Sequence, residues 1–189
     1  PVQQLAAQRS FEEVAYLLVY GELPTASALR AYVAKLKRLR GLPQPVKAAL
    51  ELLPASTHPM DVMRTGCSVL GTVLPERDSH PVAEARDIAD RLMASFGSML
   101  LYWYHYSHNG RRVEVETGDE TIAAHFLHVL HGRPPSALHA RALDQSLILY
   151  AEHEFNASTF AARVIAGTNS DFYSAITGAI GALRGPKHG

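Results

Sequence analysis

Apolar residues recur at intervals of three and four along almost the whole chain, which is the spacing of amphipathic helices. The longest such segment runs from about residue 82 to residue 106. Its apolar stripe is formed by Ile88, Leu92, Phe96, Met99 and Trp103. A stripe of this kind is typical of a helix packed against a protein core. The pattern therefore predicts an all-α protein.

Helix-capping and helix-ending residues divide this pattern into separate helices. Ser10 and Glu13 have the spacing of a capping box before a helix at 11–19, which Gly21 and Pro24 end. Further helices are predicted at about 25–40, 45–53, 59–74, 120–131, 136–150, 156–166 and 172–184. The one β-like stretch follows Asn109-Gly110, and it predicts a short strand or hairpin arm at 111–116.

Basic residues gather toward the end of the helix predicted at 25–40. They are Lys35, Lys37, Arg38 and Arg40. We expect them to point mostly outward as a solvated face, because the helix dipole favours cations near the C-terminal end. Gly41 is predicted to end this helix.

Composition indicates one globular domain, or a large piece of one, with 47% hydrophobic residues for its core. No segment resembles a linker that would divide the chain into separate domains. Eighteen basic residues balance eighteen acidic ones, so no charge excess indicates a nucleic-acid partner. No apolar stretch approaches the ~20 residues that span a membrane. Cys67, the single cysteine, has apolar and small neighbours and is expected in the core.

Two other groups invite a chemical interpretation. His125, His128 and His131 suggest zinc, but on a helix they would spread over about 120°, and no cysteine or carboxylate lies close in sequence to complete the site. Glu114 and Glu116 have the spacing of an acid–base pair, yet on a strand they would share a face with nearby arginine. For the histidines, placement near a helix end, where cations are favoured, is preferred over zinc. For the glutamates, surface charge pairing is preferred over catalysis.

The last forty residues carry two histidines outside any apolar stripe. His153 has acidic neighbours and Asn156 three residues later, and His188 follows a helix that Gly185 and Pro186 end. The helix before His188 is rich in glycine and alanine, which predicts close packing against another backbone. A loop histidine held by a rigid scaffold is a candidate for binding a carboxylate-bearing ligand. The alternative from the residues alone is an ordinary surface histidine.

The two histidines belong to motifs, HEFNAST at 153–159 and GPKHG at 185–189. Together, at this separation, they resemble the citrate synthase family. SFEEVAYLLVYGELPT at 10–25 and HPMDVMRTGCSVLG at 58–71 are similar to segments of the same family in the same order, so the resemblance covers essentially the whole chain. Within the family, the sequence from Leu147 onward is most similar to the 2-methylcitrate synthase branch.

The resemblance implies an all-α fold, the citrate synthase-like multi-helix large domain, here incomplete. Residues 1–189 are expected to be part of that large helical domain, with the small domain and the C-terminal part absent. In the family, the small domain bears a second catalytic histidine, an aspartate base and carboxylate-binding arginines. This chain alone is therefore expected to be inactive. It is also expected to lack a short N-terminal segment that the family has.

The chemistry implied by the resemblance is condensation of an acyl-CoA with the ketone of oxaloacetate, followed by hydrolysis of the thioester. The family uses no metal and no separate cofactor, because coenzyme A enters as part of the substrate. Carried over to this sequence, His188 is the catalytic donor that stabilises the enol, and His153 with Asn156 belongs to the oxaloacetate pocket. The resemblance also implies a homodimer. The single cysteine favours a reducing cytoplasm, and the charge balance and the short apolar stretches indicate no nucleic-acid or membrane partner.

Tyr150 stands where citrate synthases proper usually have histidine, beside the expected oxaloacetate pocket. Tyrosine at this position resembles the 2-methylcitrate branch and favours propionyl-CoA as the acyl donor. Two alternatives stay open at this point. One is citrate synthase proper using acetyl-CoA, and the other is a non-catalytic helical dimerisation fragment.

Overall fold

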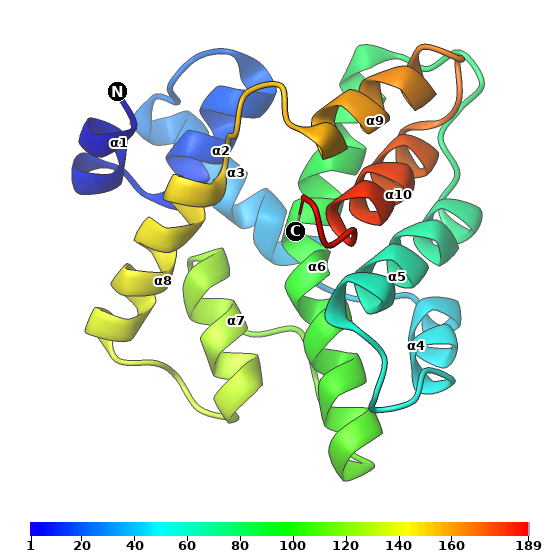
Figure 1. Ribbon diagram of the computed structural model, residues 1–189. Helices are drawn as coiled ribbons and strands as arrows, with labels where there is room; N and C mark the ends of the chain where they lie inside the picture. The colour runs from blue at the N-terminus through cyan, green and yellow to red at the C-terminus, as the bar shows by residue number, and fades with distance from the viewer. Residues whose placement is uncertain (189) are drawn as a thin grey trace. The chain divides into compact units, whose positions relative to one another are not determined.

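A computed structural model describes residues 1–188 of the chain. Within this range it contains ten α-helices and no β-strand, which confirms the predicted fold class (Figure 1). In chain order these are α1 (Val2–Gln8), α2 (Phe11–Tyr20), α3 (Ala26–Arg38), α4 (Gln44–Glu51), α5 (Pro59–Val73), α6 (Val82–Asn109), α7 (Ile122–His131), α8 (Ala137–Tyr150), α9 (Ala157–Ala166) and α10 (Phe172–Leu183). No helix of the described residues is long and apolar enough to cross a membrane.

Side-chain caps begin several helices where the sequence predicts them. At α2 the Ser10 side chain accepts the backbone N–H of Glu13, and the Glu13 carboxylate accepts the backbone N–H of Ser10. Thr25 and Ser136 cap α3 and α8 through their hydroxyl groups. Each of these caps satisfies an amide that has no partner inside its helix. The helix starts are therefore encoded locally.

The chain divides into two compact units, and each unit is built from two separate stretches of sequence. The first unit contains Pro1–Gly41 and Glu114–His153, and the second contains Leu42–Val113 and the described residues from 154 onward. No change of composition marks these boundaries, because segments distant in sequence assemble each unit. The assignment of the whole chain to one larger domain stays a prediction.

In the first unit α8 packs against α1, α2 and α7. The prediction that Arg40 points outward is wrong. Helix α3 ends at Arg38, and Arg40 beyond it is fully buried. Its guanidinium donates hydrogen bonds to the backbone carbonyls of Thr117, Asp119 and Thr121 at 3.2, 2.6 and 3.2 Å. These acceptors lie about 80 residues later in the chain, so the local charge pattern could not reveal them.

The predicted strand at 111–116 is also wrong. Helix α6 continues to Asn109, and Gly110 ends it in the left-handed conformation with φ 65°. The segment that follows has no regular secondary structure and forms no ladder with any other described segment. Arg112 instead forms an ion pair with Glu51 at 2.7 Å within the second unit. The β-like pattern therefore belongs to an irregular connection and not to a sheet.

In the second unit α10 lies between α9 and α5, and α5 also packs against α4 and α6 (Figure 1). Cys67 on α5 is fully buried, which confirms its predicted core role, and its thiol points to the carbonyl oxygen of Tyr173 at 3.8 Å. Close packing around α10 occurs at Gly178, where an added methyl group would collide with the end of the Ile165 side chain on α9, so the neighbour there is a side chain and not the expected backbone. Gly181 is less closely packed, because a methyl group added there would lie 3.8 Å from its nearest outside neighbour, the side chain of Arg64.

Candidate active site around His188

The candidate site begins at the N-terminal end of α9, where Asn156 is the capping residue. Its side-chain oxygen Oδ1 accepts the backbone N–H of Thr159 at 3.0 Å and the hydroxyl of Ser158 at 2.6 Å. Asparagine is among the strongest N-cap residues because its oxygen satisfies an otherwise unpaired amide. Asn156 therefore fixes the first turn of α9, a role that the sequence motif alone did not indicate.

A turn after α10 returns the chain to this first turn of α9. Helix α10 ends at Leu183, and the backbone N–H of His188 donates to the carbonyl of Gly185 at 3.1 Å. The half-buried His188 ring then places Nε2 3.3 Å from the backbone nitrogen of Ser158 and 3.0 Å from its Oγ. The mutual packing of α9 and α10 thus brings together residues thirty positions apart.

Ser158 was not predicted as a site residue. It lies inside the HEFNAST motif, two residues after Asn156, and is the second residue of α9. The amides of the first helical turn have no partner within the helix, so a residue at this position has a backbone donor to offer. That position, within a motif already singled out, was the signal that sequence analysis could have used.

His153 and Tyr150 belong to the first unit. Helix α8 ends at Tyr150, and the side chain of Tyr150 is 88% exposed. His153 follows three residues later and is also exposed. Their roles toward a substrate stay predictions.

Two of the three histidines of α7, His125 and His128, have partners within the first unit. His125 is 1% exposed, and its Nδ1 lies 3.0 Å from the hydroxyl of Thr117. Burial, with a smaller contribution from the positive charge of Arg40, lowers the pKa of His125 to about 4. His128 Nδ1 lies 2.7 Å from a carboxylate oxygen of Asp119. Among residues 1–188, no group of three histidine, cysteine or acidic side chains is arranged to hold a metal ion.

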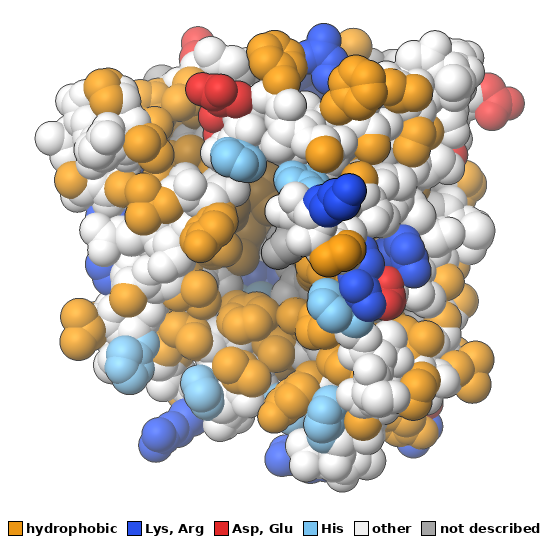
Figure 2. Space-filling view, in the orientation of Figure 1, with side chains coloured by type: hydrophobic (Ala, Val, Ile, Leu, Met, Phe, Trp, Pro, Cys, Tyr) orange, Lys and Arg blue, Asp and Glu red, His pale blue; other side chains and the backbone are white. Residues whose placement is uncertain are grey.

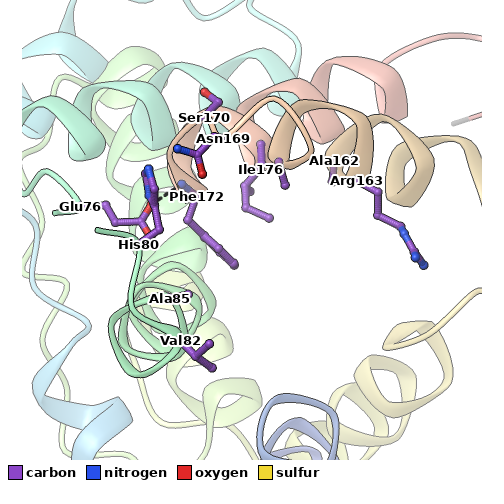
Figure 3. A pocket seen from close by; sticks show the side chains of 12 residues that line it. Glu76, His80, Val82, Ala85, Ala162, Arg163, Asn169, Ser170, Phe172 and Ile176 are labelled. Carbon is purple, nitrogen blue, oxygen red and sulfur yellow. Dashed lines mark hydrogen bonds and ion pairs between the residues drawn. The ribbon is translucent and has the colours of Figure 1, made fainter. Parts of the chain in front are cut away.

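A separate hollow of about 350 Å³ opens in the second unit (Figure 3). At one end His80 Nδ1 lies 3.4 Å from the buried carboxylate of Glu76, which also accepts the backbone N–H of Phe172 at 2.6 Å. Arg163 extends from α9 away from this pair (Figure 3). The remaining lining is largely apolar, and none of the residues around His188 contributes to it.

Helix α9 also presents an apolar surface. No residue of α9 is buried, and Phe160 and Val164 are 68% and 52% exposed. Phe155, just before the helix, is 84% exposed, and the guanidinium of Arg163 lies over its ring. Figure 2 shows hydrophobic side chains over the position of α9. Contiguous exposed apolar surface of this kind commonly marks an interaction site.

Comparison with known proteins defines the class to which this fold and site belong. The family model described as citrate synthase, C-terminal domain, matches residues 1–189. The chain therefore belongs to the citrate synthase family, as its motifs predict. A solved structure of citrate synthase from Thermoplasma acidophilum, a ternary complex with carboxymethyl coenzyme A and oxaloacetate, superposes with a TM-score of 0.89 at 29% identity and covers 99% of this chain and 49% of that one.

Curated relatives narrow the comparison. The chain is 61% identical over 188 residues to 2-methylcitrate synthase of Shewanella oneidensis, covering 100% of this chain and 49% of the relative. It is 43% identical over 189 residues to citrate synthase of Mycolicibacterium smegmatis, covering 100% of this chain and 50% of the relative. The chain thus spans about half the length of the curated relatives it matches.

Proposed function

We propose that the protein containing this chain is a 2-methylcitrate synthase, which condenses propionyl-CoA with oxaloacetate to give 2-methylcitrate and coenzyme A. The observation that carries this proposal is the 61% identity, over the whole chain, to the enzyme of that name from Shewanella oneidensis. Similarity to a citrate synthase solved with carboxymethyl coenzyme A and oxaloacetate supports the same substrate classes.

The proposed reaction forms one carbon–carbon bond and then breaks a thioester. A base removes a proton from the α-carbon of propionyl-CoA, and the thioester oxygen takes up the electron pair as the enol forms. The enol carbon attacks the ketone carbon of oxaloacetate, whose oxygen gains a proton. Water then attacks the thioester carbonyl, so coenzyme A leaves as its thiol and the third carboxylate of 2-methylcitrate forms. Two oxygens develop negative charge, and fixed hydrogen-bond donors at both would lower the barrier.

We assign the hydrogen bond to the thioester oxygen to His188. Its contacts with Ser158 hold the ring, and the turn at Gly185 holds its backbone. A donor that is already oriented costs no reorganisation when charge develops, and this is why such groups contribute strongly to catalysis.

We assign a role in binding oxaloacetate to each of His153, Asn156 and Tyr150. His153 can donate a hydrogen bond to a carboxylate or ketone oxygen. The capping role of Asn156 Oδ1 supports an orienting contribution, because that oxygen already accepts two hydrogen bonds of α9. Tyr150 can offer apolar ring surface and a hydroxyl group.

Release of coenzyme A tests the function directly. Propionyl-CoA and oxaloacetate are supplied to the purified protein that contains this chain, and thiol release and 2-methylcitrate are both measured. Omitting oxaloacetate is the control, since simple thioester hydrolysis would release thiol without it. Thiol release that is independent of oxaloacetate would contradict the proposal.

A second candidate is citrate synthase, which would use acetyl-CoA. The 43% identity to citrate synthase of Mycolicibacterium smegmatis supports it, although the identity to the Shewanella relative is higher. The two candidates share every step of the reaction and differ only by one methyl group on the acyl chain. Parallel assays with acetyl-CoA and propionyl-CoA distinguish them.

We further propose a cytoplasmic homodimer that needs no metal or separate cofactor. The exposed Phe160 and Val164 of α9 support a partner surface, because burying them against a second copy would remove apolar area from water. Light scattering on the protein as it elutes from a size-exclusion column measures its oligomeric state. A monomer at micromolar concentration would contradict the homodimer, and loss of activity with a chelator would contradict metal independence.

A further inference from the structure

An ion pair on α8 lies at the corner between α1 and α2, within the first unit (Figure 1). Its members are Arg141 and Asp144, three positions apart, and a nitrogen of the guanidinium lies 2.7 Å from Oδ2 of the carboxylate. The side chain of Asp144 is 7% exposed. A carboxylate buried to this extent is costly unless its oxygens are paired. The partners of the pair therefore show what it holds together.

Each charge binds the helix end that suits its sign. The Arg141 guanidinium donates hydrogen bonds to three backbone carbonyls at the end of α1, those of Ala6, Ala7 and Arg9, at 2.8, 3.3 and 2.9 Å. Oδ1 of Asp144 accepts the backbone N–H of Phe11, the first residue of α2, at 2.9 Å. The last carbonyls and the first amides of a helix have no partner inside it, and the helix dipole favours a cation at the first and an anion at the second. The pair thus joins α8 to two helices at once.

The same face of α8 continues as an apolar contact toward His153. Ile148 is 2% exposed and forms a core cluster with Ala6 and Val14. Ala151, the residue that follows α8, packs against the same cluster. The contact residues of α8 recur at intervals of three and four, so they lie on one side of the helix. The corner between α1 and α2 therefore contacts α8 from its second turn to a point two residues before His153.

We propose that Arg141 and Asp144 are positioning residues for oxaloacetate binding, because they fix α8, and with it His153, against α1 and α2. This inference rests on the proposed function, in which His153 donates a hydrogen bond to oxaloacetate. Such a bond weakens steeply when its donor shifts or tilts. Only two residues separate His153 from the end of α8, so the position of the helix limits where the ring can lie. The pair acts through the histidine and is assigned no contact with substrate.

Three substitutions alter the pair in different ways. Arg141→Met removes the charge and the hydrogen bonds but keeps an unbranched side chain. Arg141→Lys keeps the charge and loses the planar fork of donors that reaches several acceptors. Asp144→Asn removes the other charge and keeps an acceptor for the Phe11 amide. The matched control is Glu13→Gln, which removes an ion pair with Arg9 at 2.9 Å at the start of α2, with both partners outside α8.

Oxaloacetate affinity is the first readout, measured by titration calorimetry on the protein that contains this chain, without acyl-CoA. We expect Arg141→Met to raise the Kd for oxaloacetate about two- to thirtyfold, the range for substitutions that act through a packed network. Asp144→Asn should raise it in the same direction, and Arg141→Lys should recover part of the loss. Glu13→Gln should leave it within about twofold. An unchanged Kd in Arg141→Met, measured where the variant is folded, would overturn the proposal.

Steady-state kinetics distinguish positioning from general destabilisation. In Arg141→Met the KM for oxaloacetate should rise with the Kd, whereas kcat at saturating oxaloacetate should change less than about threefold. A loss of folded protein would instead lower the apparent kcat and leave the KM as it was. That second pattern would show that the pair only stabilises the fold.

Amide hydrogen exchange of a peptide covering residues 149–153 is the third readout, and it needs no substrate. Loosening α8 at the corner should open its C-terminal end more often, so these amides should exchange faster in Arg141→Met and nearly as before in Glu13→Gln. Unchanged exchange in Arg141→Met would also overturn the proposal. If circular dichroism shows that variant unfolded, the same measurements on Asp144→Asn decide.

The two proposals fail separately. A protein that makes 2-methylcitrate, with an oxaloacetate Kd that Arg141→Met does not change, refutes the positioning role alone. A protein whose oxaloacetate affinity and amide exchange respond as expected, but which releases no coenzyme A from propionyl-CoA, refutes the proposed function alone.

Discussion

Arg112 forms a bidentate ion pair with the carboxylate of Glu51: its Nε and Nη2 donate hydrogen bonds to Oε1 and Oε2 at 2.7 and 2.8 Å. The hydroxyl of Tyr102 donates to Oε1 as well, at 2.7 Å. These hydrogen bonds, that of Arg112 foremost, lower the pKa of Glu51 to about 2. They tie the end of α4 to α6 and to the segment after it within the second unit.

The first prediction is that Glu51→Gln weakens the dependence of stability on acid pH. The pKa of Glu51 is about 2 when folded and 4.5 when unfolded, so its contribution is complete above pH 4.5 and is lost as pH falls toward about 2. We expect the variant to have a lower urea midpoint near neutral pH and a flatter decline in that window. Urea unfolding at a series of pH values measures both.

Arg112→Gln is the matched partner variant, and the double variant closes the cycle. If the ion pair carries the effect, the second substitution should cost little once the first is made. Strictly additive losses would contradict the pairing.

The second prediction concerns His125, whose folded pKa of about 4 lies below its ordinary value of 6.5. The unfolded chain binds a proton first as pH falls. The contribution of the neutral ring is therefore complete above pH 6.5 and is lost toward pH 4, to a total of about 3 kcal/mol. His125→Gln should make the loss of stability between pH 6.5 and pH 4 less steep. The urea midpoint measured at several pH values in this range tests this.

The control is His139→Gln on α8, where the side chain is exposed. We expect that change to leave the same pH profile nearly as it was. A His125→Gln profile as steep as that of the unsubstituted protein would show that other groups cause the acid sensitivity.

Local signals in the sequence predicted the helix starts, because a cap and the amide it satisfies lie within three residues. Ser10, Thr25 and Ser136 are examples. Arg40 shows the limit of such reasoning. Its basic neighbours in sequence indicated a solvated face, but its hydrogen-bond acceptors are backbone carbonyls of residues 117–121, which are distant in sequence. The division into two units was missed for the same reason.

The candidate site was predicted in part. The motifs singled out Asn156 and His188, and the structure brings both to the first turn of α9 through Ser158. The distance between the first turn of α9 and the turn after α10 cannot be read from a sequence, so the contact that holds the His188 ring could not be derived from it. The capping role of Asn156 could have been anticipated, because asparagine is a common N-cap and this residue opens the helix predicted at 156–166.

The third prediction concerns helix contacts in the second unit. A methyl group added at Gly71 on α5 would lie 2.8 Å from Cβ and 2.9 Å from Cγ of Tyr173, whose side chain is 2% exposed. Neither atom can move without shifting α10, so Gly71→Ala should cost about 1–3 kcal/mol of the free energy of unfolding. Thermal unfolding measures it.

Gly181→Ala on α10 is the matched control, because its nearest outside neighbour would be 3.8 Å away. Alanine favours helix over glycine by about 0.5–1 kcal/mol, so this change should raise the melting temperature. Equal behaviour of the two variants would contradict the close approach of α5 and α10.

The fourth prediction separates the two histidines in the proposed enzyme. His188→Ala should lower kcat about 10²–10³-fold, the usual loss when one fixed oxyanion donor is removed, with little change in oxaloacetate affinity. His153→Ala should chiefly weaken oxaloacetate binding, by ~1–3 kcal/mol, because substrate oxygens lose a partner. Oxaloacetate titration calorimetry and steady-state kinetics on both variants measure these effects. Equal changes in the oxaloacetate dissociation constant would contradict the division of roles.

The last prediction concerns the acyl group: we expect a higher kcat/KM for propionyl-CoA than for acetyl-CoA. One extra methylene in an apolar pocket is worth only ~1–3 kcal/mol, so acetyl-CoA should remain a poor substrate and not an inert one. Tyr150→His tests the residue that motivates the expectation, and it should narrow the ratio between the two thioesters. Tyr150 is 88% exposed in the first unit, so the change should leave the melting temperature nearly unaltered and any kinetic effect can be read as specificity. Acetyl-CoA as the equal or better substrate of the unsubstituted protein would favour citrate synthase instead.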